Sequence, residues 1–246
     1  MIDLYGMSSP NVLKILIMLE ETDLEHRYTF VNVAAGEQFA PEFVALNPTS
    51  KVPVIIDDDG YDGKSTTVFE SGAILLYLAE KSGSLLPRDP AVRMVALQWL
   101  MVQISSVGPI CGQATHFIRF APPEQDYSLA RYRTLAGRLY DQLDARLGTA
   151  RWLGGDEYSI ADIATYPWVS LYHDAHGMSW SDHPHLKRWV DEVAARSAVA
   201  TAVERYNKLM SEDPSFSPDN PPEGLDRFFG RGQFSREPAK VGPDAR

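Results

Sequence analysis

Cysteine is almost absent from this 246-residue chain, which contains a single one, Cys111. One cysteine excludes an internal disulfide framework and any Cys-x-x-Cys redox pair, and it fits a reducing compartment. Basic residues are also scarce, with 23 Lys and Arg against 33 Asp and Glu, so that the net charge is −10. Because nucleic-acid binding needs clustered Lys and Arg, this balance argues against a nucleic-acid partner.

Targeting and membrane signals are missing as well. The N-terminus has no basic stretch followed by an apolar run, so no signal peptide is predicted. No apolar run approaches the roughly 20 residues that a membrane-spanning helix needs. We therefore expect a cytoplasmic protein without a membrane partner.

The six histidines show no metal-binding spacing. Only His183 and His185 lie close together, and they lack a third ligand nearby in the sequence. We expect loop and surface positions for the histidines and no bound metal.

The composition is otherwise that of an ordinary globular protein, 44% hydrophobic and 23% charged. A chain of this length favours two domains. The first eighty residues alternate strand and helix patterns: strands at 2–5, 28–33, 53–56 and 66–69, and helices at 10–19, 41–46 and 71–81. Strands joined by a helix pair in parallel and strands joined by a tight turn pair antiparallel, so this order predicts a mixed, thioredoxin-like α/β domain over residues 1–82.

Strand patterns disappear after the Ser- and Gly-rich linker at 82–87. Helical spacing predicts helices at 91–107, 127–147, 160–172 and 184–196, and hence an all-α second domain over residues 88–210. Ser159 and Asp162 have the spacing of a capping box, to which we assign no chemistry. Residues 211–246 are rich in Asp, Pro, Ser and Gly, which predicts a loop-rich tail. Its aromatic cluster (Phe228, Phe229 and Phe234) is costly to leave in water, so we expect it to fold back on the body or on a partner subunit.

Chemistry is first suggested by the start of the first helix. Ser9 precedes Pro10, as an N-cap precedes proline at the first helical position. The free N–H groups of a helix N-terminus stabilise an anion such as a thiolate, and Ser8, Ser9 and Asn11 add polar side chains there. Most Ser-Pro segments of this kind are helix caps and nothing more.

Two further segments suggest a ligand. If the Val52-Pro53 bond is cis, the N–H and C=O of Val52 can pair with an extended peptide; otherwise this is an ordinary strand start. Glu70 and Ser71 begin a helix, where Ser71 can hold a carboxylate and Glu70 an ammonium. Together they suit the zwitterionic end of an amino acid, although an acid and a cap are common at helix starts.

In combination these residues resemble the cytosolic glutathione transferase superfamily, whose fold is a thioredoxin-like domain followed by an all-helical domain. The resemblance covers about residues 1–210 and rests most specifically on the Glu-Ser-Gly-Ala-Ile-Leu-x-Tyr-Leu run that starts at Glu70. Pro10-Asn11 and Gln38 make the chain most similar to the nu class, bacterial glutathione-disulfide oxidoreductases related to the yeast Ure-type protein. The class pattern usually has threonine where this chain has Ser9, which retains the hydroxyl.

The resemblance implies a set of glutathione contacts. Val52, next to a cis Pro53, is expected to pair with the cysteine of glutathione, while Glu70 and Ser71 hold its γ-glutamyl end. Gln38 and Lys51 are implied at the glycyl carboxylate, and Asn11 is implied near the sulfur. Arg131 is implied to reach glutathione across a homodimer interface. The residues before Val52 depart from the usual pattern, so that the role of Lys51 is the least defined.

The resemblance also implies that glutathione supplies the reactive thiol. Cys111 is expected to be a small buried hydrophobe. Ser9, Asn11 and the helix N-terminus are then expected to lower the thiol pKa, so that the thiolate serves a disulfide-bond oxidoreductase or peroxidase activity and attacks a small disulfide. Two alternatives stay open: conjugation or thiolytic cleavage of aromatic electrophiles, including ethers, and a non-catalytic glutathione-binding regulator. Aromatic residues of the second domain are candidates for the wall of the second-substrate pocket, namely His116, Phe117, Phe120, Tyr166 and Trp168.

Overall fold

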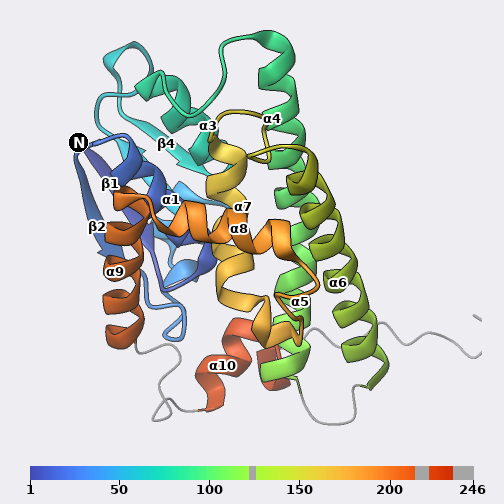
Figure 1. Ribbon diagram of the computed structural model, residues 1–246. Coiled ribbons are helices and arrows are strands. Elements are labelled where there is room, and N and C mark those ends of the chain that lie inside the picture. The colour runs from blue at the N-terminus through green and yellow to red at the C-terminus, as the bar shows by residue number, and fades with distance from the viewer. Residues whose placement is uncertain (122–125, 214–221, 235–246) are drawn as a thin grey trace, which may run out of the picture.

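The computed structural model describes residues 1–121, 126–213 and 222–234. Its N-terminal part contains a four-stranded sheet in the order β2-β1-β3-β4 (Figure 1). Strand β1 is parallel to β2, whereas β3 is antiparallel to both β1 and β4. The strands are β1 (Ile2–Gly6), β2 (His26–Phe30), β3 (Val54–Asp57) and β4 (Thr66–Phe69). The predicted thioredoxin-like sheet is confirmed, although β2 begins two residues earlier than expected because its register aligns His26 with Ile2.

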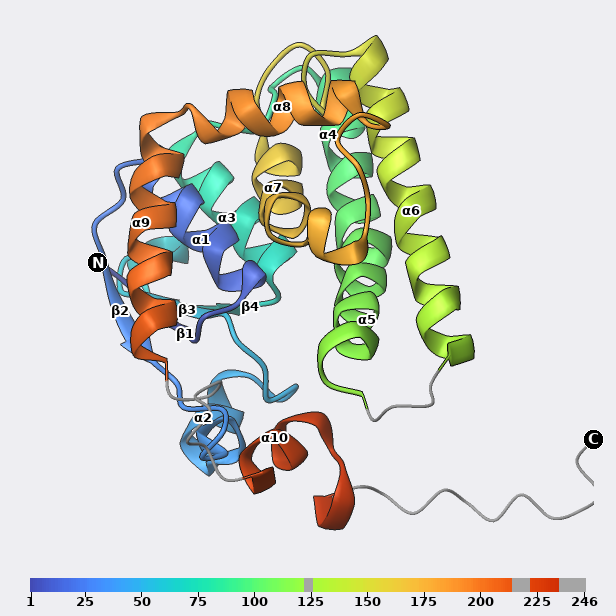
Figure 2. The same ribbon diagram turned by 60° about the horizontal axis from the view of Figure 1, so that its bottom comes forward.

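Three helices flank this sheet: α1 (Pro10–Glu21), α2 (Pro41–Leu46) and α3 (Ser71–Ser82). Figure 2 shows α1 and α3 on one side and α2 on the other. Leu4 and Ile55 belong to the main core beneath α1 and α3, whereas Val54 packs with Phe43 of α2 in a second, smaller cluster. This alternation along the strands follows from the opposite directions of successive side chains.

The rest of the chain is helical, which confirms the predicted all-α part. Its helices are α4 (Pro90–Val102), α5 (Gly108–Arg119), α6 (Asp126–Thr149), α7 (Ile160–Tyr172), α8 (Pro184–Ala194) and α9 (Ser197–Glu212). Helices α7 and α9 pack directly on α1, so that α1 is surrounded by both parts of the molecule. One continuous core therefore joins the sheet to the helices.

Helices α4 and α5 form one continuous rod interrupted by a π-helical turn, Gln103–Val107. Pro109 has no N–H to donate to the preceding turn, which accounts for the irregular backbone at this point. By length and composition the rod Pro90–Arg119 is able to cross a membrane. In this fold it is a wall of the helical bundle, in contact with α6 and α7.

The N-terminus of α7 is organised by a buried carboxylate. The Ser159 side chain accepts a hydrogen bond from Ala161 N, and Asp162 accepts from Ser159 N at 3.0 Å. Asp162 also accepts from Leu153 N and Trp189 Nε1, at 2.9 and 2.8 Å. Burial raises the pKa of Asp162 to about 6. These contacts tie the loop before α7 to α8, in agreement with the structural role assigned from the sequence.

The tail contains more regular structure than its composition predicted. Residues Pro222–Phe229 form helix α10, and a short 3-10 turn, Gly232–Phe234, follows. The ring of Phe229 lies 4.8 Å from that of His116 and 4.9 Å from that of Phe120, measured between centroids. Arg231 donates to the Phe120 carbonyl at 2.6 Å, and Arg227 donates to the Ala35 carbonyl at 3.3 Å. The aromatic cluster thus folds back on the body, where α10 bridges the end of α5 and the loop before α2 (Figure 2).

Candidate functional site

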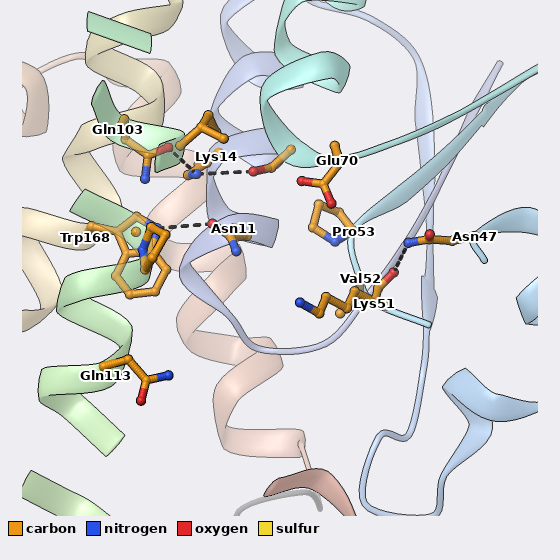
Figure 3. A pocket seen from close by; sticks show the side chains of 14 residues that line it. Asn11, Lys14, Asn47, Lys51, Val52, Pro53, Glu70, Gln103, Gln113 and Trp168 are labelled. Atoms are coloured by element: carbon orange, nitrogen blue, oxygen red, sulfur yellow. Dashed lines mark hydrogen bonds between the residues drawn. The ribbon is translucent and has the colours of Figure 1, made fainter. Parts of the chain in front are cut away.

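A cavity of about 390 Å³ lies between the sheet part and the helical part. Its walls come from α1, the segment before β3, the start of α3, the π-helical turn, α5 and α7 (Figure 3). The lining residues are Asn11, Lys14, Asn47, Lys51, Val52, Pro53, Glu70, Ser71, Gln103, Ile104, Gly108, Pro109, Gln113 and Trp168.

The segment before β3 lines the cavity with Lys51, Val52 and Pro53. The Val52-Pro53 peptide bond is cis, as the resemblance implied. Among the described residues, no backbone partner is found for the N–H or the C=O of Val52. Asn47, which is almost fully buried, donates to the Lys51 carbonyl at 2.7 Å and thereby holds the segment in place. This geometry suits an extended peptide that pairs with Val52.

The start of α3 supplies a strained acid beside a serine. Glu70 has a φ of 68°, a backbone conformation that costs a non-glycine residue about 1–3 kcal/mol. Its carbonyl still accepts from Ile74 N at 2.9 Å, so that Glu70 occupies the N-cap position of α3. Ser71 follows as the first residue of the helix and is buried. Strain of this kind concentrates at binding and catalytic sites, which supports a ligand-binding role for Glu70.

Asn11 links α1 to the helical part. Trp168 Nε1 donates to the Asn11 side-chain oxygen at 3.1 Å. Because the tryptophan nitrogen is only a donor, this contact fixes which end of the Asn11 amide is the oxygen. The Asn11 Nδ2 group therefore remains a donor at the cavity wall (Figure 3).

Ser9 and Ser8 do not line this cavity. The Ser9 hydroxyl accepts from Val12 N at 3.3 Å as the N-cap of α1. This contact uses a lone pair and leaves the hydroxyl hydrogen available to donate. The hydroxyl and the N–H of Ser8 both donate to the buried Asp213 carboxylate, at 2.5 and 3.0 Å. Of the two serines, Ser9 is thus the one whose hydroxyl group can donate a hydrogen bond to a ligand.

Two other predicted residues lie away from the cavity lining. Gln38 is buried in a 3-10 turn, where it donates to the Val33 carbonyl at 3.3 Å and leaves its side-chain oxygen without a partner among the described residues. Arg131 is an exposed residue of α6. The structure therefore brings together Asn11, Lys51, Val52, Pro53, Glu70 and Ser71, with Ser9 at the adjacent helix start.

Lys14 was not predicted from the sequence, although it is fully buried and lines the cavity. Its ammonium donates to Ser71 Oγ at 3.2 Å and to Gln103 Oε1 at 2.7 Å. Burial lowers the Lys14 pKa to about 7, and the nearby Glu70 carboxylate opposes this shift. A lysine in the middle of the otherwise apolar segment Val12–Leu19 was the available signal.

Cys111 has no direct role at this cavity. Its thiol is buried in α5 and donates to the Tyr140 hydroxyl at 3.6 Å, as expected for a small core residue. Burial raises its pKa to about 11, which disfavours the thiolate.

The expectation of surface positions is wrong for His173, His176 and His183, which are buried, although His173 and His183 do lie outside the helices. His176 bonds to Thr115 and Tyr140, and His173 bonds to His183. Among the described residues, no group of three or more His, Cys, Asp or Glu is placed to hold a metal ion.

The aromatic candidates for the second-substrate wall separate into three groups. Trp168 lines the cavity. His116 and Phe120 contact Phe229 of α10, and Phe117 stacks on Tyr132 of α6. Tyr166 is buried against Trp189, 6.3 Å between ring centroids, and is a core residue.

Comparison with known proteins agrees with this geometry. Residues 1–80 match the family model for the glutathione S-transferase N-terminal domain, and residues 108–197 match that for the C-terminal domain. The chain is 42% identical over 204 residues to the disulfide-bond oxidoreductase YfcG of Escherichia coli, covering 82% of this chain and 94% of that protein. It is 36% identical over 225 residues to the disulfide-bond oxidoreductase YghU of the same organism, covering 86% of this chain and 77% of YghU.

Solved structures resemble about four-fifths of the chain. A glutathione transferase from Pseudomonas putida, crystallised with glutathione disulfide, superimposes with a TM-score of 0.79 at 38% identity, covering 82% of this chain and 90% of that one. A glutathione transferase from Burkholderia graminis, crystallised with two glutathione molecules per subunit, superimposes with a TM-score of 0.79 at 42% identity, covering 82% and 87%.

Proposed function

Because the chain belongs to the glutathione S-transferase family, we propose that it is an enzyme that binds glutathione in this cavity and uses its thiolate to reduce small disulfides. The observation that carries the proposal is the backbone of Val52, which has no backbone partner among the described residues and lines the same cavity as the Glu70-Ser71 pair. The two curated relatives described above are both named disulfide-bond oxidoreductases, which favours this reaction over others of the family. The nu class, to which the sequence is most similar, is part of the same proposal.

The cavity accommodates glutathione in one direction. The γ-glutamyl end meets Glu70 and Ser71, the cysteine pairs with Val52, and the glycyl carboxylate points toward Lys51, with Gln38 behind it. The sulfur then lies toward the start of α1. There the Asn11 amide, the Ser9 hydroxyl and the helix N-terminus stabilise a thiolate.

The reaction requires two glutathione molecules. The first thiolate attacks one sulfur of the disulfide, forms a mixed disulfide with it and releases the other sulfur as a thiolate that takes up a proton. A second glutathione thiolate attacks the glutathione sulfur of the mixed disulfide, which yields glutathione disulfide and the second thiol. Two glutathione thiols are oxidised and one disulfide is reduced to two thiols. Cys111 is too deeply buried to take part.

A rate comparison tests this function. The purified chain is assayed with glutathione on 2-hydroxyethyl disulfide and, separately, on 1-chloro-2,4-dinitrobenzene. Disulfide reduction that exceeds conjugation by at least tenfold supports the proposal. A dominant conjugation rate shows instead a transferase acting on electrophiles, and binding of glutathione without either activity shows a regulator.

A homodimer is the proposed assembly. Helix α4 exposes the apolar side chains of Met94 and Met101, 55% and 52% of whose surfaces are accessible, and α6, which packs against α5 of the same rod, exposes Arg131 near its start. A second copy that covers this face buries the methionines and brings Arg131 toward the partner's cavity. Sedimentation velocity measures the assembly, and Arg131→Ala is expected to raise the KM for glutathione without changing the sedimentation coefficient.

We also propose a cytoplasmic location, because a reducing compartment keeps the co-substrate in its thiol form.

A further inference from the structure

The inner end of the cavity contains a buried cation that the proposed reaction does not use. Lys14 lies on α1, is fully buried, and contacts one residue from each part of the molecule: Ser71 of α3 and Gln103 of the π-helical turn. An unpaired buried ammonium is costly, so that its retention in a core helix calls for a partner of opposite charge. The Glu70 carboxylate is close enough to raise the pKa of Lys14 electrostatically, but the described residues show no ion pair between the two groups.

Lys14 determines how its two neighbours present their polar groups. An ammonium has donors and no acceptor, so Ser71 Oγ must accept from it, and the hydroxyl hydrogen of Ser71 is left to point elsewhere. In the same way Gln103 must turn its Oε1 toward Lys14. The Nε2 group of Gln103 is then a buried donor without a partner among the described residues. Gly108 gives this amide room, because a Cβ there would lie 3.2 Å from Nε2.

The inner end of the cavity therefore combines a cation, donors and one free carboxylate, that of Glu70. The chemical complement of this set is a carboxylate beside an ammonium on the same carbon atom. We propose that Lys14, held by Gln103, is a positioning residue for the γ-glutamyl carboxylate: it orients the Ser71 hydroxyl as a donor and supplies the positive charge behind it. This inference rests on the proposed function, since glutathione is the ligand that brings the carboxylate.

The arrangement makes ligand binding depend on a proton. With a pKa of about 7, Lys14 is largely neutral at pH 8 in the free protein. A carboxylate placed on Ser71 favours the ammonium form, so that binding at pH 8 takes up a proton and the affinity falls as the pH rises above 7. At pH 6 Lys14 is already charged, and no proton is taken up.

Other charged groups around α1 are engaged elsewhere. Glu21, near the C-terminal end of α1, pairs with Arg196, the residue before α9, and Glu20 faces Arg205 of α9. From α7, Asp162 is bound by Leu153, Ser159 and Trp189. Among the described residues, Glu70 is thus the charged group that acts on Lys14.

A comparison of ligands isolates the effect of Lys14. Affinities are measured by calorimetry for S-methylglutathione, which has no titrating thiol, and for its analogue in which 4-aminobutyrate replaces the glutamyl residue and removes the α-carboxylate. Lys14→Met is expected to weaken S-methylglutathione binding at pH 6.5 by at least tenfold and to change analogue binding by less than twofold. Lys51→Met is the matched control: it removes a cation at the glycyl end and should weaken both ligands equally.

A second variant protects the test against misfolding. Lys14→Met leaves the Gln103 oxygen without a partner, whereas Lys14→Met combined with Gln103→Leu removes both polar groups. The double variant should show the same selective loss of carboxylate binding, with a thermal midpoint close to that of the wild type. At pH 8 the wild type should take up protons, seen as a dependence of the binding enthalpy on the buffer, and both variants should take up none.

The outcomes separate the two hypotheses. Wild-type protein that binds neither ligand overturns the proposed function and this inference with it. The role of Lys14 alone is overturned if the wild-type protein binds S-methylglutathione but the variants lose affinity for both ligands equally. It is also overturned if the variants still take up protons on binding.

Discussion

At the scale of single residues, the cavity retains conformations and charges that the fold alone does not need. Glu70 has a left-handed φ that glycine would adopt without strain, and Lys14 places a cation in a core helix. Both residues lie at the same end of the cavity. Stability and ligand binding therefore make opposite demands on these positions.

Glu70→Gly tests this opposition. Relief of backbone strain is expected to offset the greater entropy of an unfolded glycine, so that the free energy of unfolding stays the same or rises by up to about 1 kcal/mol. Glutathione affinity should fall at least tenfold, because the acceptor for the γ-glutamyl ammonium is lost. Glu70→Gln keeps the strain and removes the charge, and it should lose affinity without any gain in stability. A large loss of stability in Glu70→Gly would show that Glu70 is not strained. Urea unfolding and calorimetry supply the two quantities.

Asn11 lines the cavity at the end where we propose that the glutathione sulfur binds. Asn11→Ala removes one donor and is expected to raise the pKa of the bound glutathione thiol by about one unit, with a roughly tenfold slower disulfide reduction at pH 7. Asn11→Asp keeps an acceptor for Trp168 but faces the sulfur with a negative charge, and should raise the thiol pKa further. Thiolate absorbance against pH measures the pKa. Gln113→Ala, an amide lost from another wall, should leave it unchanged; equal shifts in both variants would contradict the role of Asn11.

At the scale of elements, buried histidines join four helical segments. His176 of the 3-10 turn Asp174–His176 bonds to Thr115 of α5 and Tyr140 of α6, at 3.0 and 2.8 Å. His183, just before α8, bonds to Asp141 of α6 at 3.1 Å. Burial lowers the pKa of His176 to about 4. The native state accordingly excludes a proton that the unfolded chain binds.

The stability of the helical part should therefore fall on mild acidification. Above pH 6.5 His176 is neutral in both states and carries no penalty. As the pH falls from 6.5 toward 4, the unfolded chain binds the proton first, and the free energy of unfolding decreases by up to about 1.4 kcal/mol per pH unit. His176→Gln should reduce the difference in stability between pH 7.5 and pH 5, measured by urea unfolding, whereas the exposed His185→Gln should not. An unchanged difference in His176→Gln would contradict the assignment.

The sequence predicted those elements whose signals are local. Ser9-Pro10 marked the start of α1 and Ser159 with Asp162 marked the start of α7, because a cap and its helix are neighbours in the chain. Helix α9 was not predicted, although its buried face includes Val199, Ala202 and Tyr206, because it follows α8 with no glycine or proline between them to mark a new helix start. The Lys14–Gln103 contact joins residues 89 positions apart, and no local pattern predicts such a pair.

At the scale of the whole molecule, the tail connects the two parts at the periphery of the cavity. Along α5, His116 and Phe120 follow Gln113 by one and two turns, and α10 contacts both of them. No described residue of the tail lines the cavity itself. With glutathione in the proposed orientation, the contacts of α10 should therefore affect the approach of the second substrate rather than the binding of glutathione.

Deletion of residues 214–246 should separate these two effects. The KM for glutathione is expected to stay within twofold, whereas kcat/KM for a bulky disulfide should rise severalfold because the approach beside His116 and Phe120 is uncovered. Deletion of residues 235–246 alone keeps the contacts of α10 and should change neither constant. A raised KM for glutathione in the longer deletion, with unchanged selectivity among disulfides, would contradict this division. Steady-state kinetics with disulfides of increasing size provide the measurement.

The position of α1 has a consequence for how the protein is made. This helix is synthesised long before α9, which covers one of its sides. At a synthesis rate of about 5–20 residues per second, the apolar surface around Leu13 and Ile17 stays uncovered for on the order of ten to forty seconds before α9 is made. During that interval the nascent thioredoxin-like part exposes a surface of the kind that chaperones bind, although it already contains every strand of its sheet.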